Sequence, residues 1–191
     1  MKEAYTAIYK IRGLLMVPPF LVLLLVNAGE TEHDGLVWPM GIAVFACGVL
    51  VRVWAQMHLH YRLRVRKTLT MTGPYAYLRN PIYVANTTIL LGLTAMSELL
   101  WFLPIMLLWC VLVYSLVVRR EEAHLLGKYG EPYAAYLRSV PRWLPGGGAV
   151  RRQAGEWRHA RRYFWASVVA ELHCLLWLVP LLGKEMLSLW R

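Results

Sequence analysis

Five apolar stretches constrain this chain more than any other feature of its sequence. They span residues 14–26, 36–58, 82–96, 99–118 and 163–182. Hydrophobic residues make up 58% of the 191 residues and charged residues 17%, whereas an ordinary soluble domain is about half apolar. Stretches of this length and composition are typical of helices that cross a bilayer. We therefore predict an all-α, polytopic membrane bundle with about five transmembrane helices.

The connections between these stretches are short. Only Ser97 and Glu98 separate the third stretch from the fourth, which predicts an antiparallel helical hairpin. Because no Ser-rich or low-complexity linker interrupts the chain, we predict one domain over residues 1–191, with 163–182 as an extra C-terminal span. Pro180 lies near the end of that span, where we expect the helix to stop. The first stretch follows a basic start, but no Ala-x-Ala pattern comes after it, so we interpret it as a retained helix.

Basic residues predict how the chain is oriented. All but three of the 21 Lys and Arg residues lie in the N-terminal segment, in 61–81 or in 119–162, which fall on one side of a five-span arrangement. Since positive loops stay in the cytoplasm, we expect a cytoplasmic N-terminus and an external C-terminus, most simply in a prokaryotic inner membrane. A basic cytoplasmic face also explains the net charge of +10 without a nucleic-acid partner.

No metal site is expected. Cys47, Cys110 and Cys174 all lie inside apolar stretches and far from the paired spacing of a zinc site or a disulfide framework. We interpret them as small core residues.

Two basic segments carry the informative motifs. The first, 67–83, reads Lys-Thr-Leu-Thr-Met-Thr-Gly-Pro-Tyr-Ala-Tyr-Leu-Arg-Asn-Pro-Ile-Tyr. Its Gly-Pro and Asn-Pro pairs predict a rigid interfacial loop, with Pro81 in the first turn of the third helix. In the second, 119–145, we expect the fourth helix to continue as a charged helix ending near Gly130, and a short helix to begin at Glu131-Pro132.

Taken together, the two segments resemble the membrane-embedded family of isoprenylcysteine carboxyl methyltransferases and related phospholipid methyltransferases. The resemblance rests on Gly-Pro-Tyr-x-x-x-Arg-x-Pro-x-Tyr, followed by Glu-Glu-x-x-Leu, an aromatic-Gly pair, Tyr-x-x-Tyr and Val-Pro-Arg-x-x-Pro. It implies that S-adenosylmethionine binds in a cytosolic pocket formed by these segments. It also implies a hydrophobic or lipid-like acceptor that arrives from the bilayer.

The resemblance assigns roles by position. The cofactor-binding residues it implies are His60, Lys67, Thr68, Leu69, Thr70, Tyr75, Asn80, Pro81, Ile82, Tyr83 and Glu121. Glu121, Arg120 and Tyr83 are the catalytic candidates, and Arg52, Gln56 and Arg119 are the acceptor candidates. Arg52, Gln56 and His60 recur every four residues on one helical face, and a charge inside a span by default suggests function. A structural polar seam between helices is the alternative.

Two positions depart from the family pattern. Asn80 stands where the family usually has His, and an amide can donate a hydrogen bond but cannot become cationic. Val117 stands where the prenylcysteine enzymes have a substrate-binding Arg, although Arg119 and Arg120 are close. The acceptor group therefore stays open between a carboxylate and an amine.

Methyl transfer needs little machinery. The sulfonium methyl is already activated, so alignment, exclusion of water and a surface that tolerates positive charge are sufficient. Tyr75, Tyr83 and Tyr133 are candidates for cation–π contact. An amine or hydroxyl acceptor would also need a base, which Glu121, Glu122 or His124 could supply.

Other polar residues have plainer interpretations. We interpret Tyr129 and Tyr136 as interfacial aromatic residues, and Glu171 and His173 as structural residues of the last span.

The predicted function is S-adenosylmethionine-dependent methyl transfer to a lipid-like or prenylated acceptor, by carboxyl O-methylation or amine N-methylation. One alternative is an NADPH-dependent membrane reductase of the sterol-reductase-like type. Another is a non-catalytic membrane protein of the same fold. The sequence leaves the oligomeric state open.

Overall fold

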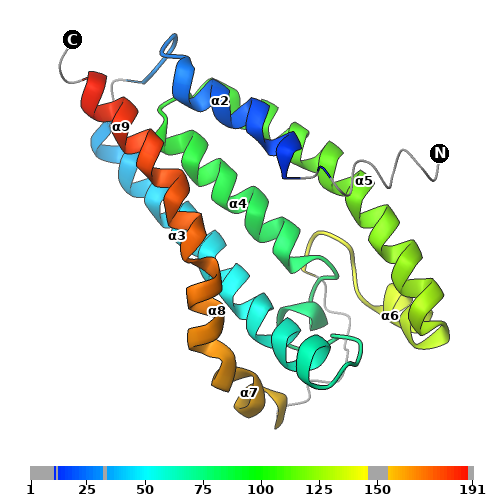
Figure 1. Cartoon of the computed structure of the whole chain (residues 1–191). Helices are drawn as coiled ribbons and strands as arrows, with labels where there is room; N and C mark the ends of the chain where they lie inside the picture. The colour runs from blue at the N-terminus through cyan, green and yellow to red at the C-terminus, as the bar shows by residue number, and fades with distance from the viewer. Residues whose placement is uncertain (1–10, 12, 32–33, 146–154, 189–191) are drawn as a thin grey trace. The chain divides into compact units, whose positions relative to one another are not determined.

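The computed structural model describes residues 11, 13–31, 34–145 and 155–188. Every regular element in these ranges is helical, and none of them contains a β-strand (Figure 1). The predicted all-α membrane bundle is confirmed. Lys2, Lys10 and Arg12, which entered the prediction of orientation, lie outside the described residues.

The helices follow the apolar stretches closely. Their bounds are η1 Leu14–Met16, α2 Val17–Leu25, α3 Asp34–Leu59, η2 His60–Val65, η3 Gly73–Ala76, α4 Pro81–Met96, η4 Leu100–Phe102, α5 Leu103–Tyr129, α6 Glu131–Ser139, α7 Gly155–Ala160, η5 Arg161–Tyr163, α8 Phe164–Glu171, η6 Leu172–Trp177 and α9 Leu178–Ser188. η2 is a turn of π-helix that prolongs α3.

Three helical segments of the described chain are long and apolar enough to cross a membrane. They are Gly35–Arg64, Leu100–Tyr129 and Trp157–Leu187. The predicted first and third spans correspond to the shorter apolar helices Leu14–Leu25 and Pro81–Met96. The 16 residues of α4 extend about 24 Å, somewhat less than a hydrocarbon core of about 30 Å. The chain is an integral membrane protein, and the number of five crossings stays a prediction.

Several predicted helix ends are confirmed. Pro81 is the first residue of α4, where its missing N–H removes no helical hydrogen bond. α5 ends at Tyr129, and Gly130 then takes a φ of +61°, a conformation that glycine adopts without steric cost. α6 begins at Glu131 with proline in its first turn.

The prediction that the last helix stops near Pro180 is wrong. α9 begins at Leu178 and continues to Ser188, so Pro180 is its third residue. The first N–H groups of a helix have no intrahelical partner, and proline is therefore tolerated there. The tighter turns of η6 come just before α9.

The chain divides into two compact units, each built from separate segments. Unit 1 comprises Met1–Gly48, Thr87–Arg120 and His173–Arg191, and unit 2 comprises Val49–Asn86 and Glu121–Leu172. They are described separately below. The single domain predicted from the sequence stays a prediction.

In unit 1, α3 and α4 meet backbone to backbone at two glycines. A Cβ atom on Gly92 would lie 2.6 Å from the backbone nitrogen of Phe45, and one on Gly41 would lie 2.5 Å from Cγ of Met96. Both distances are too short for a real Cβ contact. The two helices can therefore approach this closely only because both positions lack a side chain.

Helix α2 is held at its C-terminal end by the last helix of unit 1. α9 lies against α2, red beside blue in Figure 1. Lys184 Nζ donates to the carbonyl oxygens of Leu23 at 3.2 Å and Val26 at 3.0 Å, and it pairs with Glu30 at 2.6 Å. A lysine that bonds the last carbonyls of a helix satisfies acceptors which otherwise lack partners.

Candidate cofactor and acceptor site

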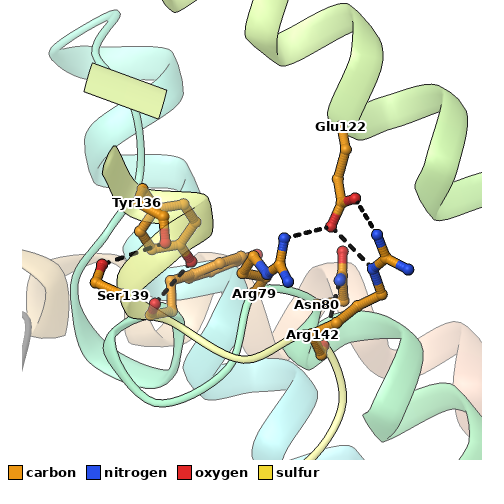
Figure 2. A network of polar contacts seen from close by, with 7 residues as sticks. Arg79, Asn80, Glu122, Tyr136, Ser139 and Arg142 are labelled. Atoms are coloured by element: carbon orange, nitrogen blue, oxygen red, sulfur yellow. Dashed lines mark hydrogen bonds and ion pairs between the residues drawn. The ribbon is translucent and has the colours of Figure 1, made fainter. Parts of the chain in front are cut away.

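One carboxylate ties together the two motif segments of unit 2. Glu122, on α5, accepts hydrogen bonds from Arg79 Nη1 at 3.0 Å and from Arg142 Nε at 3.1 Å and Nη2 at 2.5 Å (Figure 2). The Glu122 side chain is only 11% exposed. Its hydrogen bonds raise the pKa of Arg142 above the ordinary value, although partial burial of the guanidinium opposes this. We call Glu122, Arg79 and Arg142 the carboxylate clamp.

Backbone contacts join the same segments. The Arg79 N–H donates to the carbonyl of Pro141 at 2.9 Å, and the side-chain amide of Asn80 donates to the carbonyl of Arg142 at 3.3 Å. The Asn80 carbonyl also accepts from the N–H groups of Tyr83 and Val84, both at 3.2 Å, at the start of α4. Asn80 therefore uses its neutral amide to fasten the first segment to the second.

Beside the clamp lies a cluster of buried tyrosines, Tyr75, Tyr133 and Tyr136. The Tyr136 hydroxyl donates to the Tyr75 carbonyl at 2.7 Å, and the rings of Tyr133 and Tyr136 are 5.8 Å apart. Interpreting Tyr136 as an interfacial aromatic residue was wrong, because its side chain is buried by this contact and by its packing with Val140. Tyr129 is half-buried against the same cluster.

Both glutamates of α5 affect the pKa values of these tyrosines. Burial raises the pKa of Tyr133 to about 12, with Glu122 and Glu121 raising it and Arg79 and Arg142 lowering it. The pKa of Tyr75 is raised well above its ordinary value by burial, then by Tyr136 and Glu121. Both glutamates therefore act on the cluster, and the arginines of the clamp oppose this effect at Tyr133.

The loop that follows the π-helical turn contributes the next set of predicted residues. Thr68 N–H donates to the Arg62 carbonyl at 3.0 Å, and Lys67 is exposed with a φ of +54°. Leu69 packs against the tyrosine cluster together with Met71. Thr70 is buried, and its Oγ1 has no hydrogen-bond partner. A buried hydroxyl without a partner is costly and suits a ligand that supplies one.

The Gly-Pro turn of the first motif rests on a histidine that the sequence analysis missed. His58 Nδ1 lies 3.1 Å from Thr72 Oγ1. A Cβ on Gly73, whose φ is +61°, would come within 2.4 Å of the His58 ring. The glycine therefore serves both the turn and the contact with His58. The only available signal was that His58 lies one turn before Tyr61 near the basic segment.

The remaining cofactor candidates occupy the two helices that flank the loop. His60, in the π-helical turn, stacks on Tyr163 with ring centroids 4.6 Å apart. Pro81 and Tyr83 are buried in the first turn of α4, and Ile82 is half-buried there. π-Helical turns often occur at functional sites.

The acceptor candidate Arg52 is already paired. Its Nε donates to Glu171 and its Nη1 donates to Asn86, and the Glu171 side chain is only 2% exposed. Gln56 is half-buried one turn further along α3. The structural interpretation of Glu171 agrees with this ion pair, which fits the polar seam given as the alternative for Arg52.

The last candidates lie on α5 within unit 1. Arg119 is exposed and Arg120 is half-buried, immediately before Glu121 in the chain. Val117, at the departure from the family pattern, is completely buried.

Neither motif alone predicts that the three residues of the carboxylate clamp meet. Glu122 and Arg79 are 43 residues apart in the chain, and Glu122 and Arg142 are 20 apart. The only sequence signal was that each motif contains an arginine and that α5 carries two adjacent glutamates.

Known proteins resemble this chain over a region that includes most of the residues described above. Residues 37–132 match the phospholipid methyltransferase family. Cobalt-zinc-cadmium resistance protein CzcN of Cupriavidus metallidurans is 30% identical over 138 residues, covering 70% of this chain and 62% of that protein. Nickel-cobalt-cadmium resistance protein NccN of Alcaligenes xylosoxydans xylosoxydans is 28% identical over 138 residues, covering 70% and 63%. The chain thus spans less than two thirds of the length of these relatives.

No solved structure matches the chain significantly. The family match spans half of the chain and includes the loop from Lys67 to Thr70, Tyr75, the turn at Asn80 and both glutamates of α5. The chain therefore belongs to the phospholipid methyltransferase family.

Proposed function

We propose that this chain transfers a methyl group from S-adenosylmethionine to a lipid-like acceptor at the membrane interface. One observation carries the proposal: within the family-matched residues, the ion pair between Arg79 and Glu122 joins the two motif segments beside buried Tyr75, with Glu121 next in the chain. A carboxylate beside neutral aromatic rings is a suitable environment for a cationic ligand.

The residues present fit this cofactor. S-adenosylmethionine carries a sulfonium and an ammonium, so Glu121 and the tyrosine faces complement its charge. The unpaired hydroxyl of buried Thr70 offers a hydrogen bond to a polar group of the ligand. We assign cofactor binding to the loop from Lys67 to Thr70, to Tyr75, to Asn80 through Tyr83, and to Glu121, with His60 at the flank. When bound, the cofactor supplies an already activated methyl group.

The protein's part is to position groups and exclude water. The carboxylate clamp holds Arg79 and Arg142 against α5, which keeps the two motif segments in register around Glu121. Tyr75 and Tyr133 are protonated at neutral pH, and burial raises their pKa values further, so neither phenol becomes a competing nucleophile. We propose Glu121 as the group that accepts a proton from the acceptor, and Tyr83 and Arg120 as further catalytic candidates.

The polar residues favour an amine acceptor over a carboxylate. Arg52 is already neutralised by Glu171, so an acceptor carboxylate would have to displace that carboxylate. Val117 contributes no charge where the prenylcysteine enzymes have arginine. Gln56 and exposed Arg119 remain candidates for contact with the rest of the acceptor.

Calorimetric titration of the detergent-purified full chain with S-adenosylhomocysteine tests the proposal. We expect binding by the wild type, and weakening by about tenfold or more in Glu121→Gln because a hydrogen bond or ion pair to charge is removed. Glu131→Gln is the matched control, since Glu131 is an exposed carboxylate on α6. Its affinity should equal that of the wild type.

Two further outcomes would replace the proposal. Binding of NADPH but not S-adenosylhomocysteine would support the membrane reductase, and binding of neither would support a non-catalytic protein. If the cofactor binds, transfer of labelled methyl from S-adenosylmethionine into a membrane lipid extract tests the reaction itself. Label that stays non-volatile after mild base would indicate N-methylation, because a methyl ester releases its labelled methyl as methanol under those conditions.

A second candidate role is resistance to divalent metals, which is favoured only by the names of the two relatives. Growth of a strain lacking the chain, in cobalt or cadmium, would test it. If Glu121→Gln restores growth as well as the wild type does, resistance does not need the proposed methyl transfer.

A further inference from the structure

Two segments of unit 2 that are distant in the chain form one surface at the ends of long apolar helices. α7 packs against the π-helical turn η2. Their aromatic rings stack in pairs, Tyr61 on His159 with centroids 5.5 Å apart and rings 6° from parallel, and His60 on Tyr163 at 4.6 Å. The stacking fixes the two segments side by side, so that their outward side chains act together.

The outward side chains are cationic. We call the exposed residues Arg64, Arg158, Arg161 and Arg162 the arginine collar. The sequence places one acidic residue, Glu156, in α7 and no other in 35–97 or in 157–170, so the cations of these segments far outnumber their carboxylates. Glu171, which ends α8, is paired with Arg52. The collar is therefore a patch with a large excess of positive charge.

Aromatic side chains place this charge at the depth of lipid headgroups. Gly35–Arg64 ends in the collar, and Trp157–Leu187 begins there. Trp157, Phe164 and Trp165 are 52%, 40% and 74% exposed in the same stretch. Exposed aromatic residues at the end of a membrane helix prefer the boundary between hydrocarbon and headgroups.

We propose that the arginine collar binds the phosphate-bearing headgroups of anionic phospholipids. Guanidinium groups form paired hydrogen bonds with phosphate oxygens, and several of them on one rigid surface act on the same anionic leaflet. The neighbouring exposed tryptophans favour a lipid over free phosphate, because they supply contact for the acyl and glycerol region. The binding is separate from methyl transfer and does not depend on the proposed cofactor site.

Native mass spectrometry of the full chain, released from mixed micelles of phosphatidylglycerol and phosphatidylcholine, tests the collar. We expect the wild type to retain phosphatidylglycerol preferentially. Each cation near an anionic surface contributes about fivefold to binding, so Arg161→Gln with Arg162→Gln should lower the preference by roughly twenty-five-fold. The matched control is Lys128→Gln with Arg138→Gln, which removes two exposed cations outside the collar and should keep the preference.

Several results would overturn the proposal. The first is an equal loss of the preference for phosphatidylglycerol in the collar variant and in the control. The second is equal retention of the two lipids by the wild type. The third is displacement of phosphatidylglycerol by millimolar inorganic phosphate. A misfolded variant would also lose the preference, so the wild type is measured at increasing salt concentration as well. Its preference for phosphatidylglycerol should fall as salt rises, because exposed charges are screened. A preference that salt does not change would also contradict the collar.

Discussion

At the scale of single residues, two adjacent glutamates have different surroundings. Glu122 accepts hydrogen bonds from two arginines, whereas Glu121 raises the pKa of buried Tyr75. Successive residues of an α-helix point about 100° apart, so neighbours can face different groups. The second glutamate thus holds the surrounding segments in place, and the first is the residue that we propose for cofactor binding.

Glu122→Gln should destabilise the protein markedly. Arg79 and Arg142 would lose their shared carboxylate in a largely buried environment, which costs roughly 2–4 kcal/mol. The midpoint of thermal unfolding in detergent would measure the effect. Glu131→Gln breaks an exposed ion pair with Arg138 and should change stability by no more than about 0.5 kcal/mol. Equal effects of the two substitutions would contradict the clamp.

Raising the pH should destabilise the tyrosine cluster. The pKa of Tyr133 is about 12 in the folded protein against an ordinary 10.0, so the folded state holds the proton more strongly. Its contribution to stability is complete below pH 10 and is lost as the pH rises toward 12. Unfolding midpoints near pH 9 and pH 11 (about one unit either side of the ordinary value) would reveal the loss.

Tyr133→Phe should make that loss smaller, because the ring stays and the ionisable hydroxyl goes. Part of the loss should persist, since the pKa values of Tyr75 and Tyr136 are raised as well. A wild-type midpoint that is the same at both pH values would show that these phenols are not held in their neutral form by burial.

At the scale of helices, the contact between α3 and α4 in unit 1 depends on glycine. The atoms nearest to a Cβ on Gly92 all belong to the backbone of α3, so no side chain can rotate away to admit a larger residue there. This explains why two strongly apolar helices carry glycine at facing positions. Hydropathy alone treats these positions as ordinary membrane residues.

Gly92→Ala should lower the unfolding midpoint, since its new Cβ would lie 2.6 Å from the Phe45 nitrogen. Overpacking of this kind costs about 1–3 kcal/mol. Gly127→Ala is the control, because Gly127 is also helical but has nothing within 4 Å of the new Cβ. Alanine there should stabilise the helix by up to about 1 kcal/mol. The contact would be refuted if both substitutions raised the midpoint.

At the scale of the whole molecule, orientation is the main prediction left to test. Three long apolar helices and two shorter ones are present in the described chain, and the basic residues predict which ends face the cytoplasm. We propose an inner-membrane protein with its N-terminus in the cytoplasm and its C-terminus outside.

Fusion of alkaline phosphatase to the C-terminus should therefore give an active enzyme in a bacterial host, because phosphatase folds only outside the cytoplasm. A fluorescent protein at the same position should stay dark. The same two reporters fused after Tyr129 serve as the control and should give the opposite result. An inactive phosphatase and a bright fluorescent protein at the C-terminus would mean that the chain, with its N-terminus in the cytoplasm, crosses the membrane an even number of times.

Local sequence signals predicted much of this protein. Apolar length predicted the helices, Asn-Pro predicted where α4 begins, and Gly130 with Glu131-Pro132 predicted the break between α5 and α6. Each depends on neighbouring residues only, because backbone sterics and hydropathy act over a few positions. Resemblance to a family then predicted roles for the loop from Lys67 and for Glu121, which local patterns alone do not assign.

What tertiary structure alone decided is which of these residues meet. Arg52 and Glu171 pair across 119 positions of the chain, and Arg79 and Glu122 pair across 43. Tyr136 is buried rather than interfacial, and Pro180 lies inside the last helix rather than after it. These outcomes depend on how helices dock, which fixes the burial and charge partners of each side chain. No local pattern contains that information.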